Sequence, residues 1–261
     1  MDIHFECTQC GRCCYNTMIP LTVDEAGQWL DRGNSVQILC EATPWPADQA
    51  GHDPRSNHFK RRSFEAISGT MPIRVVVILV AKVVGACPHL LPDMRCGIYA
   101  TRPLVCRIYP AEVNPWIALQ PTAKACPPEA WSSDLPLLQR DGVIRNEVIA
   151  SCIRLARDSD ASDVAVKCRV ADSLRITQAG LVHDAALVFS PDRTSLAGAL
   201  SDAQSADGET ASAQWQFITD QAKTLERLTE RGLNARKLDK ECARDFEFYP
   251  LQRTPVFGPY L

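Results

Sequence analysis

The chain lacks the long apolar segment that a membrane-spanning helix needs. Its longest apolar run, Val75–Ala81, has seven residues and ends at Lys82, whereas a span takes about 20 residues. The first residues, Met1–Glu6, also lack the basic start and the apolar stretch of a secretory signal. We therefore expect a cytoplasmic protein with no membrane partner and with reduced thiols.

The chain also lacks the features of several common function classes. A net charge of −3 provides no general attraction for nucleic acid, so we expect no nucleic-acid partner. We find no glycine-rich strand-turn-helix fingerprint, no phosphate-binding loop, no defensible Ser-His-Asp arrangement and no internal repeat. A substrate, if there is one, is an unidentified protein or small molecule.

Cysteine is what the chain has in abundance, with 12 residues in all. Four of them fall within one octet, Cys7-Thr-Gln-Cys10-Gly-Arg-Cys13-Cys14. Two residues between sulfurs allow a tight turn to direct both thiolates at one ion, and Gly11 permits the positive φ that such a turn often needs. In a reducing compartment this density indicates a metal site rather than a disulfide framework.

Four later cysteines extend the candidate site. The predicted metal ligands are eight thiolates, those of Cys7, Cys10, Cys13, Cys14, Cys87, Cys96, Cys106 and Cys126. Eight sulfurs are enough for two four-thiolate sites, but one site with spare thiols, or one with an open coordination position, fits the same set. Neighbouring side chains usually diverge, so Cys13 and Cys14 do not easily bind one small ion together.

The spacing favours iron–sulfur over zinc without excluding zinc. C-x2-C-x2-C with a remote Cys-Pro, here Cys87-Pro88 or Cys126-Pro127, is typical of bacterial ferredoxins. Structural zinc more often uses paired C-x2-C knuckles, and the later cysteines are single and widely spaced. The cofactor is therefore expected to be a [4Fe–4S] cluster or Zn, since thiolate sites accept both metals.

The remaining candidate ligands have simpler interpretations. Cys40, Cys152, Cys168 and Cys242 are isolated, and we interpret those on apolar helical faces as small core residues. His89 lies two residues after Cys87, where it could bind a metal or form a hydrogen bond with a sulfur. A lone histidine is more often structural.

The pattern of apolar residues predicts an α+β fold. A β-branched run predicts a buried strand over residues 73–84, and a capping box, Thr22-Val-Asp-Glu25, begins a helix ending near Gly33. Proline, glycine and polar residues in 40–72 predict a long loop or insertion. A short helix is expected through Arg102–Tyr109, with Pro103 in its first turn.

Beyond residue 135 the sequence favours helix. Apolar residues recur at helical spacing over 143–157, less clearly over 164–176, and again over 211–231, where Trp215 and Ile218 begin the pattern. We therefore expect a small cysteine-rich metal-binding α+β domain over 1–135 and a mainly helical region over 136–261 packed on it. The tail, 246–261, is expected to pack extended.

Four segments together resemble a known family. The octet, Cys87-Pro-His-Leu90, Arg95-Cys96-Gly-Ile-Tyr99 and Arg102-Pro-Leu-Val-Cys106-Arg-Ile-Tyr-Pro110 are similar to the motifs of the CxxCxxCC family, also called the YkgJ-type cysteine-cluster family. The resemblance covers roughly residues 5–130 and implies zinc or iron chelation. A more distant resemblance to the flagellin lysine N-methylases implies iron–sulfur-dependent methyl transfer, although no other region of those enzymes is obvious here.

The resemblance also implies residues around the metal. Tyr99, Arg102, Arg107 and Tyr109 lie within the family's motifs, and the two guanidinium groups would offset the negative charge of the thiolates. Three functional hypotheses follow. The cluster takes part in modifying a protein or small-molecule substrate, it is a structural zinc module supporting a partner-binding helical region, or the Cys13-Cys14 pair senses redox state.

Overall fold

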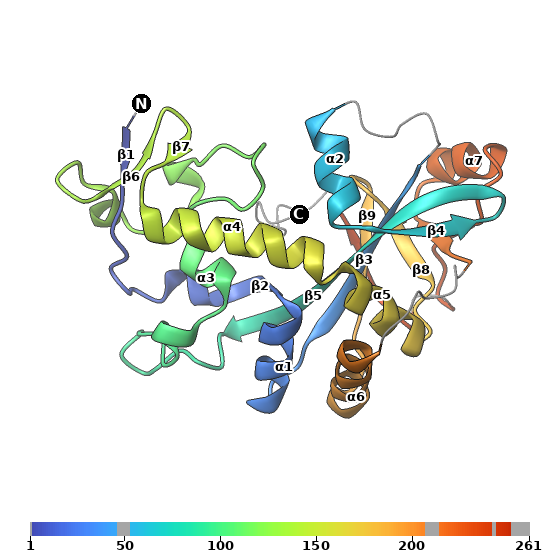
Figure 1. Ribbon diagram of the computed structural model, residues 1–261, viewed down its shortest axis with the longest axis horizontal. Coiled ribbons are helices and arrows are strands. Elements are labelled where there is room, and N and C mark those ends of the chain that lie inside the picture. The colour runs from blue at the N-terminus through green and yellow to red at the C-terminus, as the bar shows by residue number, and fades with distance from the viewer. Residues whose placement is uncertain (1, 46–52, 207–213, 242–243, 252–261) are drawn as a thin grey trace. The chain divides into compact units, whose positions relative to one another are not determined.

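The computed structural model describes residues 2–45, 53–206, 214–241 and 244–251 (Figure 1). The chain forms two compact units that alternate along the sequence. Unit 1 contains the described residues of 1–21 and 81–159, and unit 2 those of 22–80 and 160–255. Strand β5 (Met71–Ala86) and helix α4 (Glu147–Ser162) each pass from one unit into the other along the chain.

Unit 1 is built mostly of short elements and loops. Besides parts of β5 and α4, its elements are β1 (Asp2–His4), η1 (Arg12–Cys14), β2 (Tyr15–Leu21), η3 (Tyr99–Thr101), α3 (Leu104–Ile108), η4 (Pro121–Ala123), η5 (Pro128–Trp131), β6 (Leu137–Arg140) and β7 (Val143–Ile144). Strands β1, β6 and β7 form a small antiparallel sheet, and β2 is the neighbour of β5. Turns connect the rest.

A compact apolar core lies within unit 1. Phe5, three apolar residues of the α3 region and the inner face of α4 pack together. The buried members are Phe5, Leu104, Ile108, Ala111, Leu119, Ala130, Leu138, Ile149, Cys152 and Ile153. On α4, the buried Ile149, Cys152 and Ile153 follow the spacing of one helical face, so this amphipathic helix closes the core.

Unit 2 is organised around a mixed sheet with the strand order β11-β10-β8-β3-β5. β4 pairs with β5, and β9 pairs with β3 and β12. The elements are α1 (Val23–Asp31), β3 (Gln37–Pro44), α2 (Pro54–Arg61), β4 (Phe64–Ser68), α5 (Val164–Ser173), β8 (Gln178–Leu181), β9 (Ala185–Phe189), α6 (Arg193–Ser205), β10 (Gln216–Thr219), α7 (Ala222–Glu230), β11 (Ala235–Lys237) and β12 (Glu247–Pro250). Helices α5 and α6 lie side by side (Figure 1).

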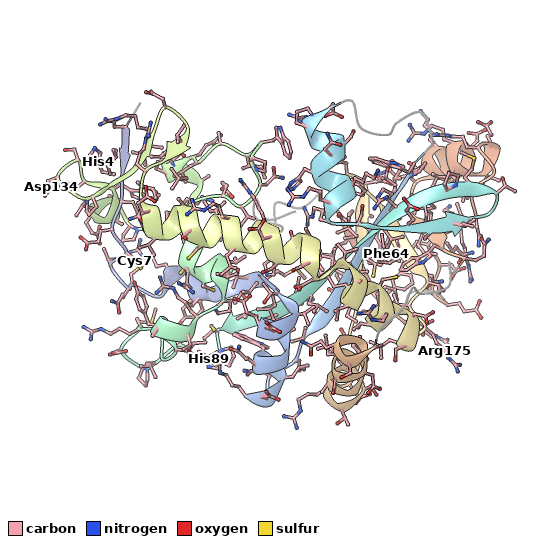
Figure 2. The ribbon with its side chains drawn as sticks, viewed as in Figure 1. His4, Cys7, Phe64, His89, Asp134 and Arg175 are labelled. Atoms are coloured by element: carbon pink, nitrogen blue, oxygen red, sulfur yellow. The ribbon has the colours of Figure 1, made fainter. Side chains whose placement is uncertain are left out.

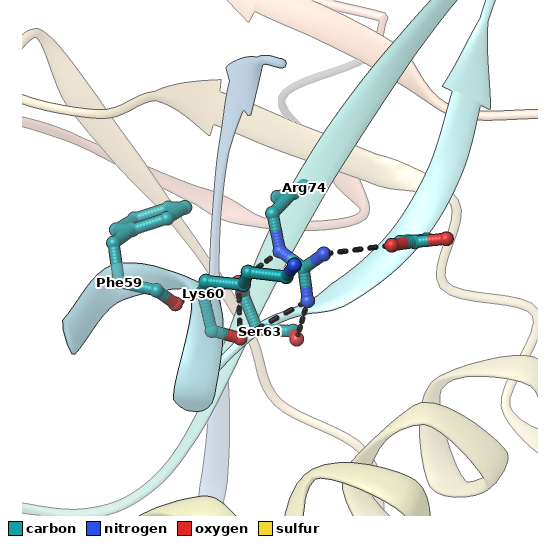
Figure 3. Close-up of polar contacts among 5 residues, drawn as sticks. Phe59, Lys60, Ser63 and Arg74 are labelled. Carbon is teal, nitrogen blue, oxygen red and sulfur yellow. Dashed lines mark hydrogen bonds and ion pairs between the residues drawn. The ribbon is translucent and has the colours of Figure 1, made fainter. Parts of the chain in front are cut away.

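The centre of this sheet is the antiparallel pair of β3 and β5, in register from Gln37↔Val80 to Pro44↔Ile73. Leu39 and Val75 are fully buried, as expected for strands covered on both faces. Arg74 is a charged side chain buried in this layer. Arg74 of β5 donates to Ser63 Oγ at 2.8 Å and to the carbonyl oxygens of Ser63 and Lys60 at 2.5 and 3.0 Å, and pairs with Glu65 (Figure 3). These bonds tie the end of α2 to the sheet.

The α+β class is confirmed, and so are several local predictions. The strand expected over 73–84 is β5, and the helices expected over 143–157 and 164–176 are α4 and α5. Helix α4 begins only at Glu147, because Val143–Ile144 is strand β7. Thr22 and Glu25 form the predicted capping box at α1, with both side-chain bonds present. The short helix expected from Arg102 is α3, which begins after Pro103.

Two predictions need correction. Residues 40–72 are not a long loop, because their described part contains the end of β3, α2 and β4. Asp53 caps α2 and Pro54 takes its first position, so the proline begins a helix rather than breaking one. Residues 211–231 are not one helix either. Gln216–Thr219 is strand β10, between β8 and β11, and α7 begins only at Ala222.

The region 136–261 carries helices α4 to α7 and also strands β6 to β12, so it is less helical than expected. In the tail, β12 is extended as predicted and pairs with β9, while 252–261 lie outside the described residues. The predicted division into two domains at residue 135 stays a prediction. The two compact units defined by contacts are a different division, because each is made of separate segments of the chain. No helix in the described ranges is long and apolar enough to cross a membrane.

Candidate metal centre

The octet folds as a tight turn fixed by glycine. Gly11 has φ 69° and precedes the 3-10 turn η1, and the Cys14 amide donates to its carbonyl oxygen at 2.9 Å. A Cβ at Gly11 would lie 2.6 Å from the carbonyl oxygen of Met94 and 2.9 Å from a methyl of Leu90. Glycine is therefore required twice, for the backbone angle and for the close approach of the 90–94 loop.

Backbone hydrogen bonds join this turn to the next two cysteines. The Cys87 amide donates to the Cys14 carbonyl oxygen at 2.7 Å, directly after β5 ends. Leu90 and Cys96 form an isolated antiparallel bridge, and Gly97 donates to the His89 carbonyl oxygen at 2.7 Å. Residues 87–97 thus form a closed loop that returns Cys96 towards Cys87. His89 lies on this loop, and Cys7 lies on the segment before η1 (Figure 2).

Cys106 comes from α3, which packs near β2. Burial raises the pKa of its thiol, and the charges of Cys13, Cys87 and Cys96 raise it further. Arg102 lowers it, because its guanidinium carries the opposite charge. Arg102 stacks on Tyr99 with its guanidinium carbon 3.7 Å from the ring centroid, and its buried Nε has no hydrogen-bond partner among the described residues.

Hydrogen bonds and a ring contact join the segment that precedes Cys7 to the segment that follows Cys126. The amides of Phe5 and Glu6 donate to the carbonyl oxygens of Pro136 and Ala130, at 3.0 and 3.1 Å, and the Phe5 and Trp131 rings lie 4.8 Å apart. These contacts draw the segment before Cys7 along the segment after Cys126.

The thiol charges divide the eight cysteines into two sets. Besides burial, the charge of Cys96 raises the pKa values of Cys87 and Cys106, and the charges of Cys87 and Cys106 add to the rise in the pKa of Cys14. The charges of Cys10 and Cys7 instead add to the rise in the pKa of Cys126. The charge of Cys13 acts on members of both sets. All eight sulfurs therefore form one neighbourhood with two parts.

The pKa of Cys13 is lowered, whereas the pKa values of Cys14, Cys87, Cys106 and Cys126 are raised. A hydrogen bond with the Cys14 side chain lowers the pKa of Cys13 to about 7 against the opposing effect of burial, and the charge of Arg102 lowers it further. The same hydrogen bond, followed by burial, raises the pKa of Cys14. Burial, followed by the charge of Cys13, raises the pKa of Cys126 to about 12, although a hydrogen bond with Tyr109 opposes this.

The donor set fits zinc or iron. All eight cysteines are free thiols, and none of them is fully buried. The unpartnered Arg102 Nε beside Cys13 and Cys106 is a donor suited to thiolate or sulfide. In the part of the chain that is described, however, no three Cys, His, Asp or Glu side chains converge closely enough to hold an ion as they stand. The backbone gathers the thiols without closing a coordination shell.

The residues expected around the metal have different positions. Arg102 and Tyr99 stack on each other, and the Tyr109 hydroxyl accepts from the amide of Ala125, next to Cys126. Arg107 is exposed on α3, so its role at the metal stays a prediction. Cys40 and Cys152 are buried core residues as predicted, Cys168 is half-buried, and Cys242 lies outside the described residues.

Sequence reasoning missed one buried ion pair. Lys124 Nζ pairs with Glu112 Oε1, and both side chains are only 5% exposed. Nothing in the local sequence marks this pair apart from the position of Lys124 two residues before Cys126. Burial of two charges is visible only in the folded chain.

Comparison with known proteins agrees with the motif pattern. Residues 6–127 match the model of the CxxCxxCC family, described as a putative zinc- or iron-chelating domain. The match confirms the family resemblance and supports a metal-binding cysteine cluster. No curated protein and no solved structure matches the chain, so the resemblance to the flagellin methylases has no further support.

Proposed function

We propose that this chain, whose residues 6–127 form a CxxCxxCC domain, binds zinc or iron through thiolates of its eight clustered cysteines. The observation that carries the proposal is that thiols from separate segments lie close together. The Cys87 amide donates to the Cys14 carbonyl oxygen at 2.7 Å. Besides burial, the charge of Cys13 raises the pKa values of Cys106 on α3 and of Cys126 before η5. Reduced thiols held together in this way repel one another as they ionise, and a bound cation removes that repulsion.

Two four-thiolate sites agree best with the local geometry. One set is Cys14, Cys87, Cys96 and Cys106, whose first three members are joined by the backbone bonds of the 87–97 loop. The other is Cys7, Cys10, Cys126 and the remaining Cys13. Four thiolates complete either tetrahedral zinc or a four-iron cluster. In this assignment adjacent Cys13 and Cys14 serve different sites.

A structural role is the first function of this centre. The cysteine-bearing segments of unit 1 after β5 consist mainly of turns, with single short helical turns and the five-residue α3. Such loops gain little from regular hydrogen bonding, and a thiolate metal centre would supply the missing cross-links.

A second candidate is chemistry at the metal. Cys7 and Cys13 are exposed, so the set that contains them faces solvent and is open to a protein or small-molecule substrate. A bound iron–sulfur cluster would supply electron transfer there. Nothing in the structure or the comparisons favours methyl transfer over other reactions.

Anaerobic purification followed by elemental analysis and visible absorption tests this function. Two zinc ions, or about eight irons with the broad absorption of iron–sulfur clusters, are expected per chain. Cys87→Ser and Cys126→Ser should each remove about half of the metal, while Cys168→Ser, a half-buried cysteine of unit 2, serves as the matched control. A wild-type protein that takes up neither metal after reconstitution contradicts the proposal, and a single variant that loses all metal contradicts two independent sites.

A further inference from the structure

Three consecutive residues that end in a cysteine are tied to one short segment of unit 1. Lys124 pairs with Glu112. The Ala125 amide donates to the Tyr109 hydroxyl oxygen at 2.8 Å. Cys126 follows Ala125 directly, and the same hydroxyl lies close enough to its side chain to oppose the rise in the pKa of Cys126 that burial causes. We call Tyr109, Glu112 and Lys124 the clasp.

The clasp has a fixed internal geometry. Lys124 Nζ lies 5.4 Å from the centroid of the Tyr109 ring, so the ammonium group that pairs with Glu112 also contacts the face of the tyrosine. Tyr109 ends α3 and Glu112 follows three residues later, beside the core residue Ala111. The phenol is therefore held on its ring face by a cation and at its oxygen by the Ala125 amide.

A buried ion pair costs free energy that apolar contacts between two segments would not. Both charges lose their hydration, and replacement of such a pair by apolar residues of similar volume is often neutral or stabilising. Simple packing therefore does not explain why Glu112 and Lys124 are both buried to 5% exposure. Positioning of a neighbouring group is the role that requires charges here, because only a cation attracts the π-face of Tyr109 in addition to pairing with a carboxylate.

The group that the clasp positions is the Cys126 sulfur. The Tyr109 hydroxyl oxygen accepts from the amide of Ala125, the residue before Cys126, and its proton stays free to donate. The Cys126 side chain lies near enough for its pKa to respond to this hydroxyl. Donors to a metal-bound ligand orient it and tune the metal, and loss of one typically costs about 10- to 100-fold in affinity or activity.

We propose that Glu112 and Lys124 are positioning residues that hold Tyr109 so that its hydroxyl donates a hydrogen bond to the metal-bound thiolate of Cys126. The inference rests on the proposed function, because it requires Cys126 to bind a metal. It gives a role to Glu112 and Lys124, which lie outside the cysteine motifs. It also adds one hydrogen bond, donated by Tyr109, to the proposed site of Cys7, Cys10, Cys13 and Cys126.

Cobalt loading of the full-length protein tests this inference. Co²⁺ takes the same thiolate ligands as zinc, and the sulfur-to-cobalt charge-transfer band reports the electron density on those sulfurs. Tyr109→Phe keeps the ring and its contact with Lys124 and removes only the hydroxyl. We expect an unchanged cobalt count, a shifted charge-transfer band and an affinity about 10-fold weaker in chelator competition.

The ion pair is tested by a single and a double substitution. Lys124→Met leaves Glu112 buried without a partner, so both the melting temperature and the cobalt affinity should fall. In Glu112→Leu/Lys124→Met the melting temperature should recover, because an apolar pair replaces the charges. The cobalt affinity should stay about 10-fold or more below wild type. Arg140→Gln, which breaks the exposed pair with Asp2 in the same unit, is the control and should bind cobalt normally.

The outcomes distinguish a failure of the proposed metal binding from a failure of the proposed hydrogen bond. A wild-type protein that binds neither cobalt nor zinc contradicts the proposed function and the inference with it. If wild type binds cobalt but Tyr109→Phe shows the same band and affinity, the inference alone is wrong. Full recovery of affinity in the double variant would show that the pair serves stability only.

Discussion

The two units of this protein depend on different sources of stability. Unit 2 buries its central strands, and Ile38, Leu39 and Leu79 are almost or fully inaccessible to solvent. Unit 1 has an apolar core of its own, built around Phe5, Ile108 and α4, but the cysteine loops extend beyond it. We therefore expect unit 2 to be stable through its buried core, and the loops of unit 1 to depend on the metal that we propose their thiols bind.

Metal removal should give the largest difference between the units. Binding of structural zinc contributes on the order of 10 kcal/mol to the folding of small thiolate sites. Chelation of the metal-loaded protein should therefore abolish hydrogen-exchange protection in residues 87–108 while the β3 and β5 amides stay protected. Hydrogen exchange with mass spectrometry measures both regions in one sample. Equal protection of residues 87–108 with and without metal contradicts the structural role.

A core truncation in unit 2 should produce the converse result. Leu39→Ala removes a fully buried side chain from the centre of the sheet and should cost about 2–5 kcal/mol of unfolding free energy. Because Leu39 lies outside unit 1, metal content measured on the folded protein should not change. Denaturant unfolding and elemental analysis provide the two readings. Loss of metal from the folded variant would show that the units are not independent in this respect.

The stability of unit 2 should also depend on pH through Glu41. This side chain is buried on β3 with Oε1 unpartnered among the described residues. Burial raises the pKa of Glu41 to about 7, against the opposing charge of Arg62. The folded state therefore holds a proton that the unfolded state releases at lower pH.

The sign follows from this raised pKa. Stability carries no penalty from Glu41 below about pH 4.5, falls as the pH rises to about 7, and is constant above that. The penalty above pH 7 is on the order of 3 kcal/mol. Glu41→Gln should remove this part of the pH dependence and be more stable than wild type at pH 8. Urea unfolding at pH 5 and pH 8 measures it, and parallel pH profiles for the two proteins would contradict the prediction.

The smallest expected contrast uses the same substitution in each unit. Gly11→Ala in unit 1 introduces a Cβ at positive φ and 2.6 Å from a backbone oxygen, so it should cost at least about 1–2 kcal/mol and reduce metal content. Gly198→Ala, on helix α6 of unit 2 with open space around it, should stabilise by about 0.5–1 kcal/mol. Thermal melting with metal analysis compares them. A Gly11→Ala protein with normal metal content would mean that the octet turn can rearrange.

Local sequence signals predicted those parts of the fold that depend on neighbouring residues. The capping box at Thr22 satisfies its own helix end, and the β-branched run of β5 suits a pleated, buried strand whatever its partners. The prediction failed at Gln216–Thr219, because a short apolar run fits helix and strand equally well and parallel pairing with β8 and β11 decided it. Proline and glycine in 40–72 were interpreted as loop, although Pro54 occupies the one helix position that suits it.

The sequence by itself determined which side chains are candidate metal ligands. Thiols at C-x2-C-x2-C spacing, a glycine inside the turn and the family motifs around Tyr99 and Cys106 are readable without coordinates. Tertiary structure alone decided which thiols are neighbours, because Cys14 and Cys87 are 73 residues apart and meet through a backbone bond made only when β5 ends beside the octet. It also decided that Glu112 and Lys124 are buried together, since the cost of removing two charges from water is offset only by partners that the folded chain supplies.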